Sequence, residues 1–462
     1  MSGNSVCPLL DIVPRRGLAD EKFKIIVKNL SPGQPVTLHS LIHSEDNDFW
    51  EAFGHYVSDA KGTVKVAEMG SLGGSFEGVE PMGLLWSMKP VPGSRPGLRF
   101  RKKDVRNPVT VRISVYAGHI SNGFKEKPAL AYTITERWYI APGVSRVDVK
   151  NNGIRGTLFL PPDFASHGKG CVSGPGPFPG ILDLWGGGGG LVEYRSALLA
   201  SHGYATLVLE YLFNKDKEET SGEDLGNKYF EAAFTFLKEH PQVASDRVAL
   251  LGLSFGTSVA LGMAAYSTVI CPACLVCISG SHVHPVKDSL SDVFSQMGKN
   301  FDNVFKEYGE SKHGLRNVHK TRYDENNYII WRDLLLPIPT DPDQKVDVGK
   351  IKCPLLMVVG EDDQNWPSAE SAEDMGKMME SAGNRHLLTL LSYPGTGHLI
   401  EPPYSPHVRS SNFMIAQEKK KVIVLWGGET KLHSFAQEDS WQKILTFLKQ
   451  HLYHGSDATP KL

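Results

Sequence analysis

The sequence predicts a β-sandwich followed by an α/β domain with a parallel sheet, and two observations support this fold class. From about Lys22 to Ile140, apolar and polar residues alternate, with turn-forming clusters of Gly, Pro, Asn and Asp between the alternating stretches. After Pro142 and Gly143 the apolar runs no longer alternate, and helix-like segments separate them. Such runs are typical of parallel strands that are covered on both faces. We therefore assign residues 1–143 to an N-terminal β-sandwich and residues 144–462 to an α/β domain.

The same two patterns locate the individual elements. In the sandwich, alternation predicts strands at Val36–Leu41, Leu98–Arg101 and Val109–Tyr116. In the second domain, unalternating runs predict buried strands at Gly180–Leu184, Ala205–Leu209, Val248–Leu251 and Leu355–Val359. Helices are predicted at Tyr229–His240 and Thr257–Ala265. Between Ser281 and Val348 the pattern is looser, which fits either a cap over an active site or a surface insertion.

Charge and hydropathy exclude several classes of protein. There are 49 Lys and Arg against 51 Asp and Glu, a formal charge of −2, whereas proteins that bind nucleic acid through its phosphates are usually strongly basic. No run of about 18 apolar residues occurs, so we expect no transmembrane helix. The first residues include Asp11, Arg15 and Arg16 and lack the apolar stretch of a signal peptide. We therefore expect a protein that is synthesised in the cytosol and has no nucleic-acid partner.

Three cysteines, Cys271, Cys274 and Cys277, are evenly spaced in a way that could suggest a metal. A zinc or iron–sulfur site needs a fourth ligand and usually a second pair at a defined distance. The three cysteines lie instead within the apolar run Ile270–Ile278, which is typical of a buried strand. We interpret them as core residues and expect neither a metal nor a bound cofactor.

The stretch Val248–Gly262 carries the strongest chemical signal. It contains the motif Gly252-x-Ser254-x-Gly256 between an apolar strand and a helix. In a nucleophile elbow, glycines let the strand and the helix approach closely, and a sharp turn exposes the serine hydroxyl. Because the bare motif also arises by chance, its position between strand and helix is what distinguishes it from a structural turn. We predict that Ser254 is the nucleophile of an α/β-hydrolase domain.

A serine nucleophile needs a base, and the base needs an orienting carboxylate. In α/β-hydrolases these follow in the order Ser, Asp or Glu, His. Acids follow the last predicted strand, and Asp363 has the usual position of the triad acid. Its rivals are Glu361 and Asp362, one of which could instead cap the next helix. His398 lies 35 residues after Asp363, in a glycine-rich loop behind the next strand, and we predict that it is the base.

Acyl transfer also needs an oxyanion hole, made of two N–H groups aimed at the developing negative charge. One N–H is expected from Phe255, the residue after the nucleophile. The other is expected from Gly187 or Gly188, within a run of glycines that follows the strand ending at Leu184. Such a run could also be a hinge or a phosphate cradle, but a cradle usually requires a Lys and a Ser or Thr that are absent here.

Four stretches of the chain resemble the type I acyl-CoA thioesterases and their relatives, the bile acid-CoA:amino acid N-acyltransferases. The stretches are Leu72–Trp86, Arg155–Pro162, Gly186–Tyr194 and His398–Tyr404. The resemblance covers essentially the whole chain and implies an N-terminal β-sandwich joined to a C-terminal α/β-hydrolase domain. It also implies a catalytic triad of Ser254, Asp363 and His398, the residues already reached from motif and spacing.

The resemblance further implies an acyl-CoA thioesterase that hydrolyses fatty acyl-CoA to a fatty acid and CoA. The N-acyltransferases use cysteine as the nucleophile, so Ser254 favours hydrolysis. The chain departs from the family at Phe255, where lysine is frequent, and at Gln364, where histidine is common. Phe255 is expected to place an apolar ring beside the nucleophile. An amino acid N-acyltransferase, a general carboxylesterase and a non-catalytic binding protein remain as alternatives.

Two further features concern partners and location. Six basic residues in the sandwich either contact the phosphates of CoA or form a solvated charged hairpin, which we favour. They are Arg95, Arg99, Arg101, Lys102, Lys103 and Arg106. The last residues, Pro460, Lys461 and Leu462, resemble the peroxisomal address Ser-Lys-Leu, with proline in the first position. Since several family members are peroxisomal, the resemblance implies a peroxisomal protein carried by an import receptor, with the cytosol as the alternative.

Overall fold

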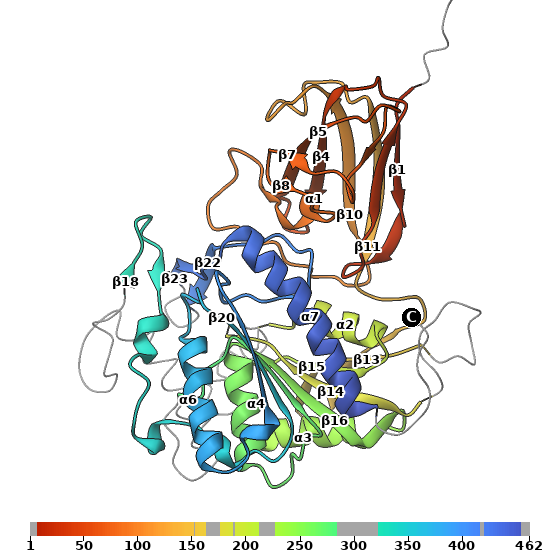
Figure 1. Cartoon of the computed structure of the whole chain (residues 1–462). Helices are drawn as coiled ribbons and strands as arrows, with labels where there is room; N and C mark the ends of the chain where they lie inside the picture. The colour runs from red at the N-terminus through yellow and green to blue at the C-terminus, as the bar shows by residue number, and fades with distance from the viewer. Residues whose placement is uncertain are drawn as a thin grey trace, which may run out of the picture. The chain divides into compact units, whose positions relative to one another are not determined.

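Two compact units make up the chain, the first formed by Met1–Ala141 with Pro402–Val408 and the second by Pro142–Glu401 with Arg409–Leu462 (Figure 1). The computed structural model describes residues 7–151, 153–162, 176–187, 190–211, 227–283, 322–415 and 420–453. The sequence-based boundary after residue 143 assigns residues 402–408 to the second domain. In the structure, Tyr404 of this segment belongs to the apolar core of the first unit.

Mostly antiparallel strands build the first unit. Its larger sheet has the order β2-β11-β10-β4-β5-β9. These strands are β2 (Arg16–Leu18), β4 (Pro35–His43), β5 (Phe49–Val57), β9 (Lys89–Pro90), β10 (Val109–Ala117) and β11 (Ala131–Trp138). The smaller sheet has the order β1-β3-β6, with β1 (Leu9–Val13), β3 (Lys24–Lys28) and β6 (Val64–Lys65). The short strands β7 (Ser71–Leu72) and β8 (Glu77–Gly78) pair with each other and precede helix α1 (Gly83–Trp86).

Alternation in the sequence appears as alternation in burial. In β5, every second residue from Trp50 to Tyr56 is buried, and side chains from both sheets share one apolar core. The predicted strands at 36–41 and 109–116 lie within β4 and β10. The prediction of a strand at Leu98–Arg101 is wrong, because this segment is irregular. Leu98 and Phe100 nevertheless pack against the apolar core, so apolar residues at alternate positions can contact a core without strand pairing.

Within the described residues, the second unit is built on a sheet with the strand order β12-β13-β15-β14-β16-β17-β20-β21. Its strands are β12 (Ser145–Asn151), β13 (Ile154–Leu160), β14 (Phe178–Leu184), β15 (Ala205–Leu209), β16 (Val243–Leu253), β17 (Leu275–Ile278), β20 (Leu355–Gly360) and β21 (Leu388–Tyr393). Neighbours from β15 to β21 are parallel, whereas β12 and β13 pair in antiparallel fashion. A sandwich followed by a largely parallel sheet confirms the predicted fold class.

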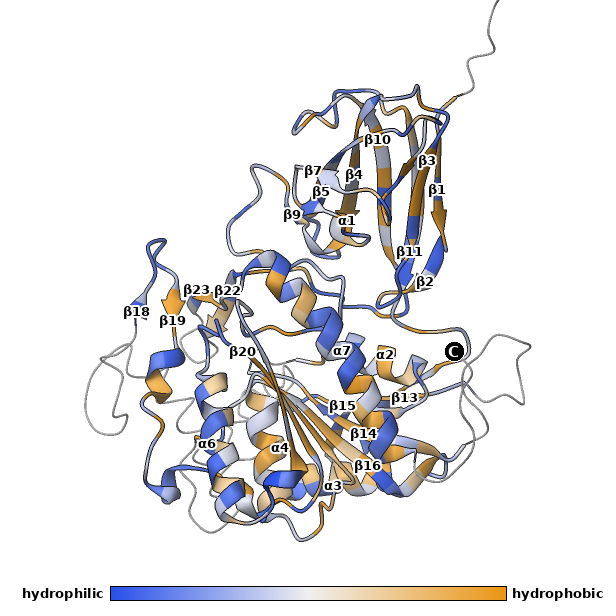
Figure 2. Cartoon of the chain, in the orientation of Figure 1, coloured by the Kyte–Doolittle hydropathy of each residue, from blue (hydrophilic) through white to orange (hydrophobic). Residues whose placement is uncertain are grey.

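Helices cover both faces of this sheet. Helices α3 (Asn227–Lys238), α4 (Phe255–Tyr266) and α6 (Ser368–Ser381) share one apolar core with one face of the strands. Helices α2 (Tyr194–Ser201) and α7 (Thr430–Leu452) lie on the other face (Figure 1). Strands covered on both sides have no solvent-exposed face, so their apolar runs are continuous. The orange colour of β14, β16 and β20 in Figure 2 shows these runs.

The segment between Ser281 and Val348 is described only in part. Residues 284–321 lie outside the described residues, and the expected cap or surface insertion falls largely on them. The described remainder contains β18 (Arg322–Tyr323) and β19 (Ile329–Ile330). With β22 (Ser410–Ile415) and β23 (Lys420–Leu425), these strands form a small sheet that the sequence did not predict. No helix in the described part of the chain is long and apolar enough to cross a membrane.

Candidate active site

Ser254 lies in the sharp turn between β16 and α4. Strand β16 ends at Leu253, helix α4 begins at Phe255, and Ser254 between them has a φ of 56° and a ψ of −121°. This positive φ is strained for a residue with a side chain and costs on the order of 1–3 kcal/mol. The N–H of Ser254 donates to the carbonyl oxygen of Ile278 at 2.8 Å, which ties the turn to β17. This local geometry is typical of a nucleophile elbow.

Close packing around the turn explains the glycines of the motif. A Cβ atom on Gly252 would lie 2.4 Å from the carbonyl oxygen of Gly256, and one on Gly256 would lie 2.3 Å from that of Leu184. Without side chains at these positions, the start of α4 can pack directly against the end of β14. A Cβ atom on Gly186 would lie 3.1 Å from the Cβ of Ser254. The glycine-rich turn after β14 therefore lies directly beside Ser254.

His398 lies between the two other residues of the predicted triad. Its Nε2 is 2.8 Å from Ser254 Oγ, and its Nδ1 is 2.8 Å from Asp363 Oδ2. A carboxylate can only accept hydrogen bonds, so Nδ1 carries the hydrogen and Nε2 accepts the hydrogen bond of the serine hydroxyl. All three side chains are buried, and they follow the carboxyl ends of β16, β20 and β21. The arrangement is suited to removing the serine proton and activating Ser254 as a nucleophile.

The Asp363 carboxylate is held by donors on both of its oxygens. Oδ1 accepts hydrogen bonds from the backbone N–H groups of Asn365 and Trp366, each at 2.9 Å. Oδ2 accepts from the Ser368 hydroxyl at 2.8 Å, as well as from His398. Four donors fix the plane of this carboxylate, and with it the direction from which it meets the imidazole.

The two rival acids have other partners. Asp362 Oδ2 accepts a hydrogen bond from the backbone N–H of Gly428 at 2.7 Å and pairs with Arg409 at 3.0 Å. Glu361 is exposed and accepts a hydrogen bond from the Ser392 hydroxyl at 2.9 Å. Of the three acids that follow β20, Asp363 is the one hydrogen-bonded to His398.

Trp426 supports His398 through its backbone and its ring. The N–H of His398 donates to the carbonyl oxygen of Trp426 at 2.9 Å. The two rings are stacked, with centroids 5.7 Å apart and an angle of 17° between their planes. The indole N–H donates in turn to Ser411 Oγ at 2.8 Å. Trp426 directly follows β23, so the β22–β23 hairpin carries a residue that positions His398.

The turn after β14 contains Gly187, one of the residues predicted for the oxyanion hole. The carbonyl oxygen of Trp185 accepts a hydrogen bond from the Tyr211 hydroxyl, which fixes the start of the turn. Gly187 is described, whereas Gly188 lies outside the described residues. The Phe255 ring, expected beside the nucleophile, is buried in the core of the second unit and stacks on Tyr211 with centroids 6.4 Å apart. Tyr211 thus contacts both segments from which the oxyanion donors are predicted.

The cysteine run lies at the start of β17. Cys274 and Cys277 are buried, as predicted for core residues, whereas Cys271 is exposed and the prediction is wrong for it. Burial raises the pKa of the Cys277 thiol well above its ordinary range, which keeps it protonated. Within the residues that the structure describes, no three His, Cys, Asp or Glu side chains gather as a metal site.

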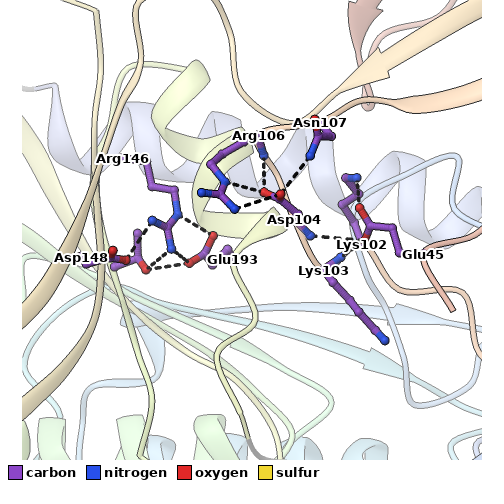
Figure 3. Close-up of polar contacts among 10 residues, drawn as sticks. Glu45, Lys102, Lys103, Asp104, Arg106, Asn107, Arg146, Asp148 and Glu193 are labelled. Atoms are coloured by element: carbon purple, nitrogen blue, oxygen red, sulfur yellow. Dashed lines mark hydrogen bonds and ion pairs between the residues drawn. The ribbon is translucent and has the colours of Figure 1, made fainter.

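Ion pairs involve four of the six basic residues that the sequence singled out in the first unit. The pairs are Arg95–Asp48, Lys102–Glu45, Lys103–Asp46 and Arg106–Asp104. Glu45 also accepts a hydrogen bond from the backbone N–H of Lys103 at 2.6 Å, which joins two of the pairs (Figure 3). Because the acids offset these positive charges, the contacts favour a charged surface segment over a binding site for the phosphates of CoA.

Three residues that contact the triad or its neighbours were not predicted from the sequence: Ser368, Trp426 and His433, whose ring bonds to the backbone of Gly397 and Leu399. Ser368 starts α6 five residues after Asp363, and its position at a helix start could have suggested a hydrogen bond back to the acid. Trp426 and His433 follow the hairpin of β22 and β23. No local motif connects them to His398, so only the folded chain reveals their contacts.

Comparisons with known proteins confirm the resemblance. The family model "Acyl-CoA thioester hydrolase/BAAT N-terminal region" matches residues 20–151, and "BAAT / Acyl-CoA thioester hydrolase C terminal" matches residues 226–454. Among solved structures, a thermophilic esterase from Thermogutta terrifontis is 12% identical and covers 69% of this chain and 96% of its own, with a TM-score of 0.40.

Curated relatives match over nearly the full length. Acyl-coenzyme A thioesterase 3 of Mus musculus is 37% identical over 97% of this chain and 95% of its own. Peroxisomal succinyl-coenzyme A thioesterase of Mus musculus is 38% identical, covering 95% of each chain. Acyl-coenzyme A thioesterase 2, mitochondrial, of Homo sapiens is 36% identical over 94% of this chain and 82% of its own. This chain therefore belongs to the acyl-CoA thioester hydrolase/BAAT family.

Proposed function

We propose that this protein hydrolyses fatty acyl-CoA to a free fatty acid and CoA, with Ser254 as the nucleophile. The observation that carries the proposal is the position of His398, hydrogen-bonded at 2.8 Å both to Ser254 Oγ and to Asp363 Oδ2. The relatives named above are acyl-coenzyme A thioesterases, which supports a thioester substrate. CoA enters as part of the substrate, and the reaction needs no metal and no bound cofactor.

The chemistry follows from the two hydrogen bonds of His398. Nε2 takes the proton of Ser254 as Oγ attacks the thioester carbonyl, and Asp363 stabilises the resulting imidazolium. The N–H groups of Phe255 and of Gly187 or Gly188 stabilise the oxyanion. The C–S bond then breaks, and His398 returns the proton to CoA, which leaves as a thiol.

A second cycle at the same residues releases the product. His398 removes a proton from water, whose oxygen attacks the acyl ester on Ser254. When that intermediate collapses, the C–O bond to Ser254 breaks and the serine oxygen regains its proton from His398. The fatty acid leaves and the enzyme returns to its starting state. An oxygen ester is less reactive toward amines than a thioester, so a serine acyl-enzyme favours water over glycine or taurine as the acceptor.

Thiol release from a panel of acyl-CoAs tests the proposal. We expect the wild-type protein to release CoA at a rate that is insensitive to glycine and taurine, and Ser254→Ala to lose at least about 10⁴-fold in kcat. Conjugate formation that requires the amine would instead indicate the N-acyltransferase activity. Preference for simple oxygen esters would indicate a carboxylesterase, and equal release by Ser254→Ala would refute the role of the serine.

A peroxisomal location is part of the proposal. It is supported by the likeness of Pro460, Lys461 and Leu462 to a peroxisomal address, although these residues lie outside the described part of the structure. One relative carries a peroxisomal name and another a mitochondrial one. We expect an N-terminal fluorescent fusion to enter peroxisomes through the import receptor and to remain in the cytosol when the last three residues are deleted. Equal distribution of both fusions would contradict this address.

A further inference from the structure

His433 is a buried histidine directly beneath the loop that carries His398. It belongs to the second turn of α7 and is 2% exposed. No sequence motif includes it, and the hydrolytic mechanism does not use it. Both ring nitrogens nevertheless bind backbone groups of one short segment, Gly397–Leu399, which we call the histidine loop.

The two contacts of His433 flank the proposed base. The N–H of Gly397 donates to His433 Nδ1 at 3.1 Å, and His433 Nε2 lies 2.9 Å from the carbonyl oxygen of Leu399. An amide N–H can only donate and a carbonyl can only accept, so Nδ1 is bare and Nε2 carries the hydrogen. Both bonds are therefore available only to the neutral ring in this one tautomer.

Together with Trp426, these bonds fix three consecutive residues of the histidine loop. The N–H of His398 is held by the carbonyl oxygen of Trp426 at 2.9 Å, while His433 holds the residues on either side. Gly397 cannot carry a side chain here, because a Cβ atom would lie 2.4 Å from the carbonyl carbon of Gly427. These contacts restrict movement of the His398 backbone relative to Ser254 and Asp363.

We propose that His433 is a positioning residue that holds His398 at hydrogen-bonding distance from both Ser254 and Asp363. The inference rests on the proposed function, in which His398 is the base. A shift of about 1 Å in a catalytic group can cost about 100-fold in rate, so the support of the loop bears directly on kcat. Substrate binding does not involve His433, so KM is not expected to change.

The surroundings of His433 keep it in the neutral form. Burial lowers its pKa to about 4; the nearby Asp362 opposes this shift, and His398 adds to it. At neutral pH the ring is uncharged, as both contacts require. Protonation would place a second N–H against the N–H of Gly397 and break the clamp on that side.

Three substitutions separate the two contacts. His433→Phe keeps an aromatic ring and removes both hydrogen bonds. In His433→Asn the side-chain oxygen can replace Nδ1 as the acceptor for Gly397, and in His433→Gln the side-chain amide can replace Nε2 as the donor to Leu399. His282→Phe is the matched control, because His282 is fully buried and bonds to Asp374 at 2.7 Å, away from the histidine loop.

The measurements are kcat and KM for acyl-CoA hydrolysis, with active sites counted by fluorophosphonate labelling of Ser254. Counting labelled sites restricts the comparison to folded molecules, and thermal midpoints report the loss of stability separately. We expect His433→Phe to lose about 10- to 100-fold in kcat with KM unchanged. We expect His433→Asn or His433→Gln to recover part of that loss, and His282→Phe to retain the wild-type kcat per active site.

A wild-type kcat per active site in His433→Phe would overturn the proposal, as would an equal loss in His282→Phe. Failure of the proposed function looks different, because the wild-type protein would then release no thiol from any acyl-CoA. In that case the rate of fluorophosphonate labelling still tests His433, since labelling needs His398 to activate Ser254 and needs no acyl-CoA. Slower labelling of His433→Phe than of His282→Phe would support the positioning role, and equal rates would refute it.

Discussion

The nucleophile elbow and the histidine loop both position a catalytic side chain, but they do so by different means. At the elbow, the support comes from the backbone around the turn: Ser254 has a positive φ, and Gly252 and Gly256 lie so close to the start of α4 and the end of β14 that a Cβ atom is excluded. At the histidine loop, the support comes from Trp426 and His433, which lie 28 and 35 residues after His398.

Glycine is required in both places, and the difference lies in what it packs against. A Cβ atom on Gly252 would meet Gly256 of the same motif, whereas one on Gly397 would meet Gly427, which is 30 residues away. The elbow is therefore formed mainly within one consecutive motif, which Gly256 connects to the end of β14 through its close approach to Leu184. The conformation of the histidine loop depends on contacts with residues that follow the β22–β23 hairpin and with α7.

The largest effect is expected at the residue that connects the acid to the histidine loop. In Asp363→Asn, the amide oxygen is expected to occupy the Oδ1 position, because two backbone N–H groups donate there. The amide NH₂ then faces His398 Nδ1 and forces its hydrogen onto Nε2, which can no longer accept from Ser254. We expect a loss of about 10⁴-fold in kcat from steady-state thiol release.

The matched control for this substitution is Asp362→Asn. Asp362 is the neighbouring acid; it accepts hydrogen bonds from Gly428 and Gln364 and pairs with Arg409. We expect its kcat to stay within about tenfold of wild type, since one exposed ion pair is worth at most about 1 kcal/mol. A larger loss in Asp362→Asn than in Asp363→Asn would reverse the assignment of the acid.

The contrast between the two regions also explains what the sequence could predict. Ser254 could be predicted as the nucleophile because the strand, the glycines, the serine and the helix are consecutive between Val248 and Gly262. Asp363 and His398 could be predicted because parallel strands bring their carboxyl ends to one edge of the sheet. The order of the elements along the chain was therefore enough to place the two residues near Ser254. The continuous apolar runs of β14, β16 and β20 predicted the buried sheet for the same reason.

The rest depended on contacts between distant segments. His433 lies in a helix whose sequence shows only an amphipathic pattern, in which a buried histidine resembles any other core residue. The small sheet of β18, β19, β22 and β23 joins strands from either side of β20 and β21. At Leu98–Arg101, alternation predicted a strand, but Leu98 and Phe100 pack against the apolar core from an irregular segment. Local sequence patterns indicate which side chains are buried, but they do not indicate which distant segment those side chains pack against.

A single added methyl group at Gly256 is expected to disrupt the packing of the nucleophile elbow. In Gly256→Ala, the Cβ atom would lie 2.3 Å from the carbonyl oxygen of Leu184 and 2.8 Å from that of Trp185. Because both atoms are backbone, α4 must move away from β14, and we expect a loss of about 4 kcal/mol in the free energy of unfolding. Urea unfolding and the rate of fluorophosphonate labelling measure the two consequences.

Gly376→Ala is the control for this substitution. Gly376 lies within α6, and a Cβ atom there would be in ordinary contact with Arg385 Nε at 3.6 Å and Leu388 Cδ2 at 3.9 Å. Replacing a helical glycine by alanine at an unstrained site is expected to stabilise by about 0.5–1 kcal/mol. If both variants were equally stable, the close approach of α4 to β14 would not be what the glycine motif provides.

The smallest expected effect is a pH dependence of stability. It distinguishes the two regions, because the histidine loop is held by a titratable side chain, His433, and the contacts described for the elbow are made by backbone groups. Burial holds the pKa of His433 at about 4, below the ordinary value of 6.5 that it has in the unfolded chain. Between these values the unfolded chain binds more protons, so stability rises with pH across this window. The contribution is complete above about pH 6.5, is lost as the pH falls toward about 4, and amounts to at most about 3 kcal/mol.

Urea unfolding of wild type and His433→Phe from about pH 7.5 down to about pH 4.5 isolates this contribution. Burial also lowers the pKa of His282, and its effect is present in both proteins and cancels in the difference. We expect the wild-type protein to lose more stability than the variant as the pH falls, so that the two curves converge. Parallel curves would mean that His433 binds protons equally in the folded and the unfolded chain, so that folding does not lower its pKa, and would refute the neutral ring that the bonds to Gly397 and Leu399 require. Convergence would show that the histidine loop, unlike the elbow, is held by a group that acid can disconnect.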